Sequence, residues 1–319
     1  MQWKNICVLG GSGFVGNHII SRLVKKGYQV RVLTRRREAH RDLLVLPTLE
    51  LIEADIHNLN VLRKYFANQD AVVNLVGILN EKGDSGKGFR HAHPDLAQKI
   101  AHACHDAQVQ RILHMSALNA DTNNGVSHYL VSKGEAEDLL HAVKDIHVTS
   151  FRPSVIFGPG DSFLNRFAGL LALTPILPLA CSWARFAPIY VEDVAEVFVQ
   201  SLNMPATYGK RYDLCGPRVY TLKQLVNYVA RVVGYRRIIY SLGRFPSWLQ
   251  ANILEYFPGK PLSRDNYRSL QQDSVCTAPF PKEFHITPTT LESVAPYYLR
   301  KQNIRTSLYS YRSSARKDD

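Results

Sequence analysis

A tyrosine and a lysine four residues apart, preceded by a serine, are the first candidates for chemistry in this sequence. Tyr129 and Lys133 lie in a segment with helical patterning, where positions i and i+4 share one face. A lysine ammonium beside a phenol lowers the phenol's pKa, so Tyr129 is expected to donate or accept a proton. Ser116, thirteen residues before Tyr129, is expected to hydrogen-bond the substrate oxygen. The alternative is a solvent-exposed helical pair.

Glycines near the start of the chain have the spacing of a phosphate-binding turn. Gly10, Gly13 and Gly16 follow the apolar run at 6–9 and precede a helical pattern. Such a turn lets the backbone approach a pyrophosphate, and the helix N-terminus attracts the anion. A purely structural loop is the alternative. The residues expected to contact a dinucleotide here are Gly10, Ser12, Gly13, Phe14, Val15 and Gly16.

The second apolar strand, 29–34, is followed by arginines where NAD-specific sites usually place a carboxylate. Arg35 is nearest the strand end, ahead of Arg36 and Arg37. Because a guanidinium suits a phosphate and a carboxylate repels one, NADP(H) is favoured over NAD(H), with Arg35 on the 2′-phosphate. A solvated basic turn is the alternative. Lys133 is expected to bind the nicotinamide ribose.

Two later strand ends offer further cofactor contacts. Asp55 follows the third strand, where a carboxylate can accept from the adenine amino group. Asn74 and Gly77 end the fourth strand, where the central part of the cofactor passes. Each of them could equally serve as a turn or cap residue.

Continuous apolar strands alternate with helices through the first half of the chain. This alternation predicts an α/β fold, a Rossmann-type doubly wound parallel sheet with helices on both faces. The expected divisions are an NADP(H)-binding domain at 1–156 to which 187–215 returns, a smaller irregular substrate or partner region at 157–186 and 216–299, and a basic flexible tail at 300–319. Within the second region, Thr221 is expected to cap a helix that runs to Val233.

The order and spacing of Ser116, Tyr129 and Lys133 resemble the short-chain dehydrogenase/reductase superfamily over roughly 5–215. This resemblance implies that the three residues are catalytic. It also implies that Pro153 lies where the chain turns over the nicotinamide. The segments 74–77, 116–118, 152–161, 190–195 and 262–266 resemble the extended or atypical branch, which is epimerase/dehydratase-like and includes the nucleotide-binding accessory subunit of respiratory complex I and its bacterial relatives.

The sequence departs from this family at one position. Other members carry a catalytic asparagine on the helix after the fourth strand, whereas this chain has Arg90, His91 and His93 near that region. A proton relay through asparagine is therefore not expected. The two histidines lack further metal ligands in the sequence, so a loop or helix-start role is favoured and no metal is expected.

Two functions from different classes follow. The first is an NADP(H)-dependent oxidoreductase or epimerase-type enzyme with Tyr129 as acid/base. The second is a non-catalytic nucleotide-binding accessory or assembly protein associated with respiratory complex I or quinone metabolism. The substrate is an unidentified small molecule or quinone-like compound.

Composition bounds the partners and the setting. The chain has 319 residues and a formal net charge of +12, yet it carries no nucleic-acid-binding motif, so no nucleic acid is expected. No run of eighteen apolar residues occurs, although 167–191 is apolar enough to line a pocket or to lie on a membrane. The five cysteines are widely spaced, which favours a reduced, cytoplasmic setting, with a peripheral position on the inner face of a membrane as an option.

Overall fold

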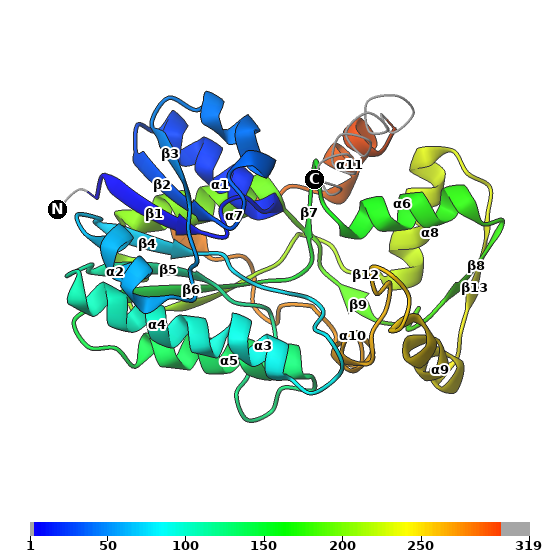
Figure 1. Cartoon of the computed structure of the whole chain (residues 1–319). Coiled ribbons are helices and arrows are strands. Elements are labelled where there is room, and N and C mark those ends of the chain that lie inside the picture. The colour runs from blue at the N-terminus through cyan, green and yellow to red at the C-terminus, as the bar shows by residue number, and fades with distance from the viewer. Residues whose placement is uncertain (1–2, 301–319) are drawn as a thin grey trace.

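Seven parallel strands form the central sheet in the computed structural model, which describes residues 3–300. Their order is β11-β6-β5-β4-β1-β2-β3 (Figure 1), and the predicted fold class is confirmed. The basic tail predicted at 300–319 lies, apart from its first residue, outside the described residues. The strands are β1 (Asn5–Leu9), β2 (Gln29–Thr34), β3 (Leu49–Glu53), β4 (Ala71–Asn74), β5 (Arg111–Met115), β6 (His147–Pro153) and β11 (Arg211–Leu214).

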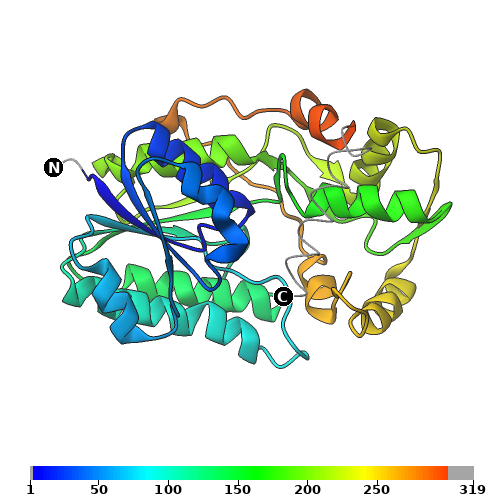
Figure 2. The same cartoon turned by 45° about the horizontal axis from the view of Figure 1, so that its top comes forward.

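Helices cover both faces of this sheet, because its strands are apolar on both sides. One face packs against α1 (Phe14–Lys25) and α7 (Val191–Leu202), and the other against α2 (Leu59–Phe66), α4 (Pro94–Asp106) and α5 (His128–His141). Because the seven strands are parallel, their carboxyl ends lie at a common edge of the sheet. This edge faces the second lobe in Figures 1 and 2. The short elements of this half are η1 (Glu38–Val45), α3 (Lys87–Ala92) and η2 (Pro205–Thr207).

The second lobe has its own apolar core, built mainly from α6, α8 and α11. Thr221 forms a reciprocal capping box with Gln224 at the start of α8, so the predicted cap is confirmed. The elements of this lobe are α6 (Phe163–Leu173), β8 (Ile176–Leu179), β9 (Arg185–Phe186), β12 (Tyr220–Thr221), α8 (Leu222–Val233), β13 (Ile238–Ser241), α9 (Arg244–Leu254), α10 (Arg264–Ser269) and α11 (Leu291–Leu299). The pair β7 (Ile156–Phe157) and β10 (Ile189–Tyr190) connects the two halves.

The chain returns to the first half within the segment 187–215, where a return is expected, and again at a later segment that is not expected to return. Residues 189–214 supply α7 and β11 to the first half. The segment around η3 (Lys282–Phe284), expected in the second region, also returns there, and Phe284 is buried against Phe151 and Tyr212. The apolar stretch 167–191 supplies much of the second core through α6 and β8. No helix among the described residues is long and apolar enough to cross a membrane.

The structure corrects one expectation about the cysteines. Cys215, just after β11, forms a disulfide bond with Cys276, whereas all five cysteines were expected to be reduced. The two are 61 residues apart in sequence, and they meet because 274–276 runs beside the connection that follows β11. Cys7, Cys104 and Cys181 are buried thiols.

Candidate active site

The glycine turn between β1 and α1 has the backbone geometry that excludes side chains. Gly10 has a φ of +74°, and a Cβ there would lie 3.0 Å from the backbone of Leu75 and Val76. A Cβ on Gly16 would lie 2.4 Å from the carbonyl oxygen of Gly11. Ser12 and Gly13 lie in the turn, and Phe14 and Val15 begin α1, which has no acidic residue in its first turn and no side-chain cap. The N-terminus of α1 therefore suits a bound anion.

The arginines after β2 are exposed at the same edge of the sheet. Neither Arg35 nor Arg36 takes part in an ion pair within the described part of the chain, whereas Arg37 donates its backbone N–H to Glu53. Asp55, after β3, accepts from the backbone N–H of His57 at 2.9 Å and is exposed. Asp55 thus forms the turn before α2, as its alternative interpretation expected, and its position at the strand end leaves an adenine contact open.

Asn74 is the last residue of β4, and Gly77 lies in the connection that follows this strand. The Asn74 side chain is buried, with its amide nitrogen 3.2 Å from His114 Nδ1 and its oxygen accepting from the Val76 N–H. A Cβ on Gly77 would lie only 3.0 Å from Lys133 Nζ. Pro153 ends β6 and accepts a hydrogen bond from the backbone of Leu118. These residues shape the edge of the site.

Ser116 carries one of the buried polar atoms that have no hydrogen-bond partner among the described residues. It follows β5 directly, is 3 % exposed, and its Oγ atom has no hydrogen-bond partner among the described residues. Buried hydroxyl groups are normally hydrogen-bonded, so an unpaired one at a strand end is a candidate ligand contact. This property agrees with the role predicted for Ser116.

Lys133 reaches the same strand end from α5. Its Nζ atom donates to the carbonyl oxygens of Met115, at 3.0 Å, and Val76, at 3.1 Å. Burial lowers the pKa of Lys133 to about 8, and the nearby Glu137 carboxylate opposes that shift. Glu137, itself buried, binds the guanidinium groups of Arg152 and Arg211 and thereby ties α5 to β6 and β11.

The Tyr129 hydroxyl does not behave as the sequence predicts. Burial raises its pKa to about 12, although its side chain keeps some solvent exposure. No hydrogen bond joins Tyr129 to Lys133 in the described residues, because the lysine ammonium is directed to two backbone carbonyls. The expected lowering of the phenol's pKa by Lys133 is therefore wrong for this structure. The ring instead packs edge-on against Phe89 and His93.

His93 is a site residue that sequence reasoning set aside. It lies between α3 and α4, and its Nδ1 is 2.8 Å from Ser132 Oγ while its Nε2 accepts from the Ile78 N–H. Burial, with Lys133 and His114 nearby, lowers the pKa of His93 to about 2. His93 is therefore neutral. His91 faces away and stacks on His57, so the two histidines do not form a common site.

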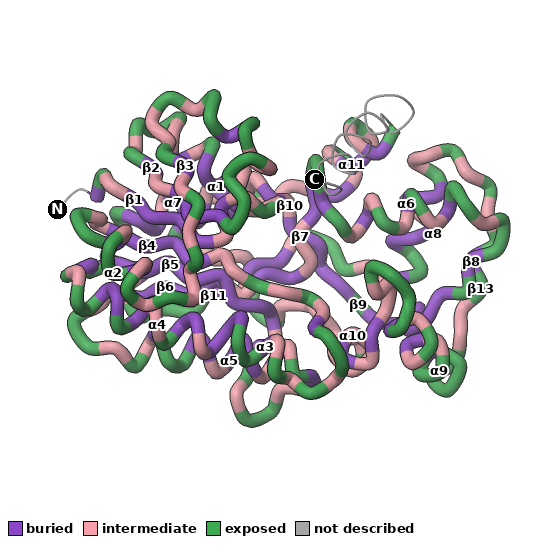
Figure 3. The backbone as a smooth tube through the Cα atoms, in the orientation of Figure 1, coloured by how far each residue is buried: buried purple, intermediate pink, exposed green. Residues whose placement is uncertain are grey.

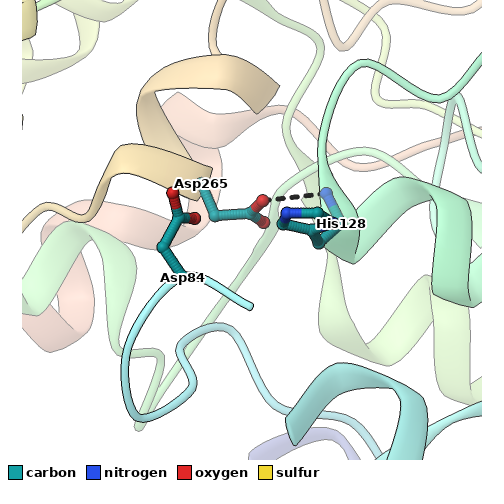
Figure 4. Close-up of side chains that lie close together, drawn as sticks. All are labelled: Asp84, His128 and Asp265. Carbon is teal, nitrogen blue, oxygen red and sulfur yellow. Dashed lines mark hydrogen bonds between the residues drawn. The ribbon is translucent and has the colours of Figure 1, made fainter. Parts of the chain in front are cut away.

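A second residue that was missed, Asp265 on α10, holds the N-terminus of the helix that carries Tyr129. Its carboxylate accepts from the backbone N–H of His128 at 2.8 Å (Figure 4) and from that of Tyr129 at 3.1 Å. Asp84 lies beside it, and the donor atoms of Asp84, His128 and Asp265 lie within 4.8 Å of one another. Arg268 binds both carboxylates, so ion pairs join α10 to the loop that carries Asp84, and Asp265 links α10 to α5 through its backbone contacts. Only the partial match at 262–266 pointed toward this region in the sequence.

Comparison with known proteins gives a consistent result. The model of the NAD dependent epimerase/dehydratase family matches residues 6–215. The mitochondrial NADH dehydrogenase (ubiquinone) 1 alpha subcomplex subunit 9 of Mus musculus is 28 % identical over 305 residues, which cover 92 % of this chain and 79 % of that protein. The ceramide reductase of Caulobacter vibrioides is 31 % identical over 203 residues, covering 63 % of this chain and 61 % of that protein.

Solved structures share the fold at lower sequence identity. Pal from Bacillus thuringiensis has a TM-score of 0.74 at 16 % identity, covering 93 % of this chain and 97 % of that one. A UDP-glucuronic acid 4-epimerase variant from Bacillus cereus, solved with NAD and a fluorinated substrate analogue, has a TM-score of 0.66 at 19 % identity, covering 83 % of this chain and 98 % of that one.

Proposed function

The chain belongs to the NAD dependent epimerase/dehydratase family, and from that premise we propose that it is an NADP(H)-dependent oxidoreductase that interconverts a carbonyl and an alcohol, with Tyr129 as the acid/base. The observation that carries this proposal is the buried Ser116 hydroxyl without a partner. It lies next in sequence to Met115, whose carbonyl binds Lys133. In this proposal Ser116, Tyr129 and Lys133 have complementary roles at the carboxyl edge of the sheet.

The residues present fit a nicotinamide dinucleotide. The turn at Gly10 and Gly16 packs closely on the backbone before the N-terminus of α1, where the pyrophosphate would bind. Exposed Arg35 would bind the 2′-phosphate, and Lys133 the nicotinamide ribose. When bound, the nicotinamide supplies or accepts the hydride. The proposal of NADP(H) over NAD(H) depends on the arginine that follows β2 and on the lack of an acidic residue there.

The chain's own residues handle the proton and the substrate oxygen. In the reducing direction, Ser116 Oγ donates a hydrogen bond to the carbonyl oxygen and Tyr129 gives that oxygen its hydroxyl proton, which completes the alcohol. The resulting phenolate is stabilised by the Lys133 ammonium, whose third proton is not used by the two backbone carbonyls. The raised pKa of Tyr129 keeps the phenol protonated, which is the form that donates in this direction. Contact between the phenolate and Lys133 requires a shift of the lysine or of the tyrosine ring, because Lys133 is bound to two backbone carbonyls.

A non-catalytic accessory role is the second candidate. Two observations favour it: similarity to a mitochondrial NADH dehydrogenase subunit extends over 92 % of this chain, and Lys133 is engaged by backbone carbonyls rather than by Tyr129. In that role the bound dinucleotide stabilises the fold, and the proposed partner is a respiratory complex or an enzyme of quinone metabolism.

Two measurements decide between these functions. Native mass spectrometry of the purified protein shows whether a dinucleotide is carried and whether its mass includes the 2′-phosphate; NAD in its place would overturn the assignment of Arg35. Turnover of NADPH is then assayed across a panel of ketones and quinones, with Tyr129→Phe as the test variant. We expect loss of turnover with unchanged NADPH affinity, whereas no turnover by the parent protein on any compound would support the accessory role.

A further inference from the structure

Helix α9 exposes its apolar side chains to solvent. Phe245 is 70 % exposed, and Trp248, Leu249 and Ile253 are also exposed at helical spacing. Tyr256, 82 % exposed, and Phe257 extend the surface just beyond the helix. Figure 3 shows α9 at the end of the second lobe, away from the central sheet. We call the exposed side chains of 245–257 the α9 face.

The fully buried residues of α9 are small. Ser247 and Ala251 are fully buried, and the Ser247 hydroxyl accepts from the backbone N–H of Cys181. Glu255, just after the helix, is buried and accepts from Arg264 Nε at 2.6 Å. A surface helix of a soluble protein has the opposite arrangement, with apolar residues inward and charges outward. Exposed apolar patches of this kind mark interaction surfaces, so we expect a partner to cover the α9 face.

The apolar surface continues onto the ribbon of β8 and β13, which leads into α9. Ile238 pairs with Ile176 and Tyr240 with Pro178, and all four side chains are exposed. The Gln250 side chain binds the Pro178 carbonyl, which places α9 next to this ribbon. The two surfaces meet at the far end of the second lobe (Figure 1).

The two segments that surround this surface carry basic but no acidic residues, although Arg185 is paired with Asp273 and Arg218 with Glu292. Neither 162–191 nor 214–254 contains an aspartate or a glutamate. The cations of these two segments are Arg166, Arg185, Arg218, Lys223, Arg231, Arg236, Arg237 and Arg244. Arg236 precedes β13 in the sequence and Arg244 follows it, and both side chains are exposed. A complementary partner of this surface presents apolar groups to the exposed apolar side chains and negative charge to the nearby arginines.

We propose that the α9 face and the adjoining ribbon dock on a bilayer that contains anionic lipids, with α9 lying in the interfacial plane. A helix that is aromatic and aliphatic on one side, flanked by basic residues, has the composition of such an interfacial element. The side chains of Trp248 and Tyr256 on the α9 face suit the headgroup level. The nearby Arg236 and Arg244 attract anionic headgroups. A second copy of the chain fits less well, because two-fold pairing would bring like charges together.

Vesicle flotation with the full chain tests this proposal. The probes are vesicles of phosphatidylcholine alone and of phosphatidylcholine mixed with phosphatidylglycerol. We expect the chain to float with the anionic vesicles, and to do so less as salt is added. Trp248→Ser combined with Phe257→Ser should reduce the partition coefficient at least roughly ten-fold. Arg236→Gln combined with Arg244→Gln should reduce it about five-fold per charge.

The control replaces two exposed apolar residues of the first half of the molecule by serine. Val45 and Leu139 are exposed there, and Val45→Ser with Leu139→Ser should leave flotation unchanged. Thermal melting checks that all variants are folded. The proposal is overturned if the parent chain does not float with anionic vesicles, or if the control pair lowers flotation as much as the α9 pair. It is also overturned if light scattering shows a dimer that the α9 pair dissociates, since a second copy would then be the occupant.

Discussion

The side chain of Asp265 accepts a hydrogen bond from the backbone N–H of Tyr129 at 3.1 Å, although 136 residues separate the two. The same carboxylate accepts from His128, so it caps the first two N–H groups of α5, in addition to the N-cap Ser127, whose side chain accepts from the Leu130 N–H. The second lobe thereby sets the position of the helix on which the proposed acid/base lies.

Replacing Asp265 by alanine removes this cap. We expect Asp265→Ala to lower the free energy of unfolding by about 1–2 kcal/mol, because two N–H groups and the Arg268 guanidinium lose an acceptor. Turnover should fall as well, and Asp265→Asn should restore part of both. Urea unfolding and steady-state kinetics provide the measurements.

Asp84→Ala is the matched control for Asp265, because it removes an Arg268 partner and leaves both α5 contacts intact. Equal losses of turnover in the two alanine variants would contradict a role for Asp265 in positioning Tyr129.

The lowered pKa of Lys133 predicts pH-dependent cofactor binding. Burial brings this pKa from 10.5 to about 8, so the ammonium loses its proton as pH rises through about 8. NADPH affinity, measured by fluorescence titration, should weaken across that range. Lys133→Met should bind weakly at every pH and lack the step. A step that persists in this variant would assign the titration to another group.

The same shift has an effect on stability that can be measured without cofactor. Between about pH 8 and 10.5 the unfolded chain binds more protons at Lys133 than the folded chain does. The free energy of unfolding should therefore gain a rising contribution from Lys133 in this window, and Lys133→Met should remove it.

Arg35 should distinguish the two nicotinamide dinucleotides. Arg35→Ala is expected to weaken NADPH binding roughly ten-fold, because a charge-assisted contact to the 2′-phosphate is lost. NADH binding should change little. Arg41→Ala is the control, since Arg41 is exposed nearby and is paired with Glu38. Equal loss of affinity for both nucleotides in Arg35→Ala would remove the basis for NADP(H) preference.

His93 should make the fold sensitive to acid. Its pKa is lowered from 6.5 to about 2, so between these values the unfolded chain binds more protons at this residue. Stability is therefore lost as pH falls below about 6.5, at up to roughly 1.4 kcal/mol per pH unit. His93→Gln can still bind Ser132 and Ile78 but does not titrate. Comparing urea unfolding at pH 7 and pH 5, we expect the variant to lose about 2 kcal/mol less than the parent; equal losses would contradict a neutral buried His93.

The features that local sequence could predict are those that depend on short spacings. The turn at Gly10 to Gly16, the alternation of strands and helices, and the cap at Thr221 each involve residues a few positions apart. Ser116 could be proposed as a site residue because it follows an apolar strand pattern. Lys133 could be proposed because it lies four residues after Tyr129 in a helical pattern. The family resemblance supplied their order, and both residues lie within the range 6–215 that the family model matches.

The tertiary structure decided which groups remain free and which surfaces remain open. The unpaired Ser116 hydroxyl, the carbonyl contacts of Lys133 and the neutral state of His93 depend on which backbone atoms surround them. The Asp265 cap and the Cys215–Cys276 bond join segments that only folding brings together. The exposure of the apolar residues of α9 also depends on packing. Only packing shows that the small residues of α9 are the ones turned inward.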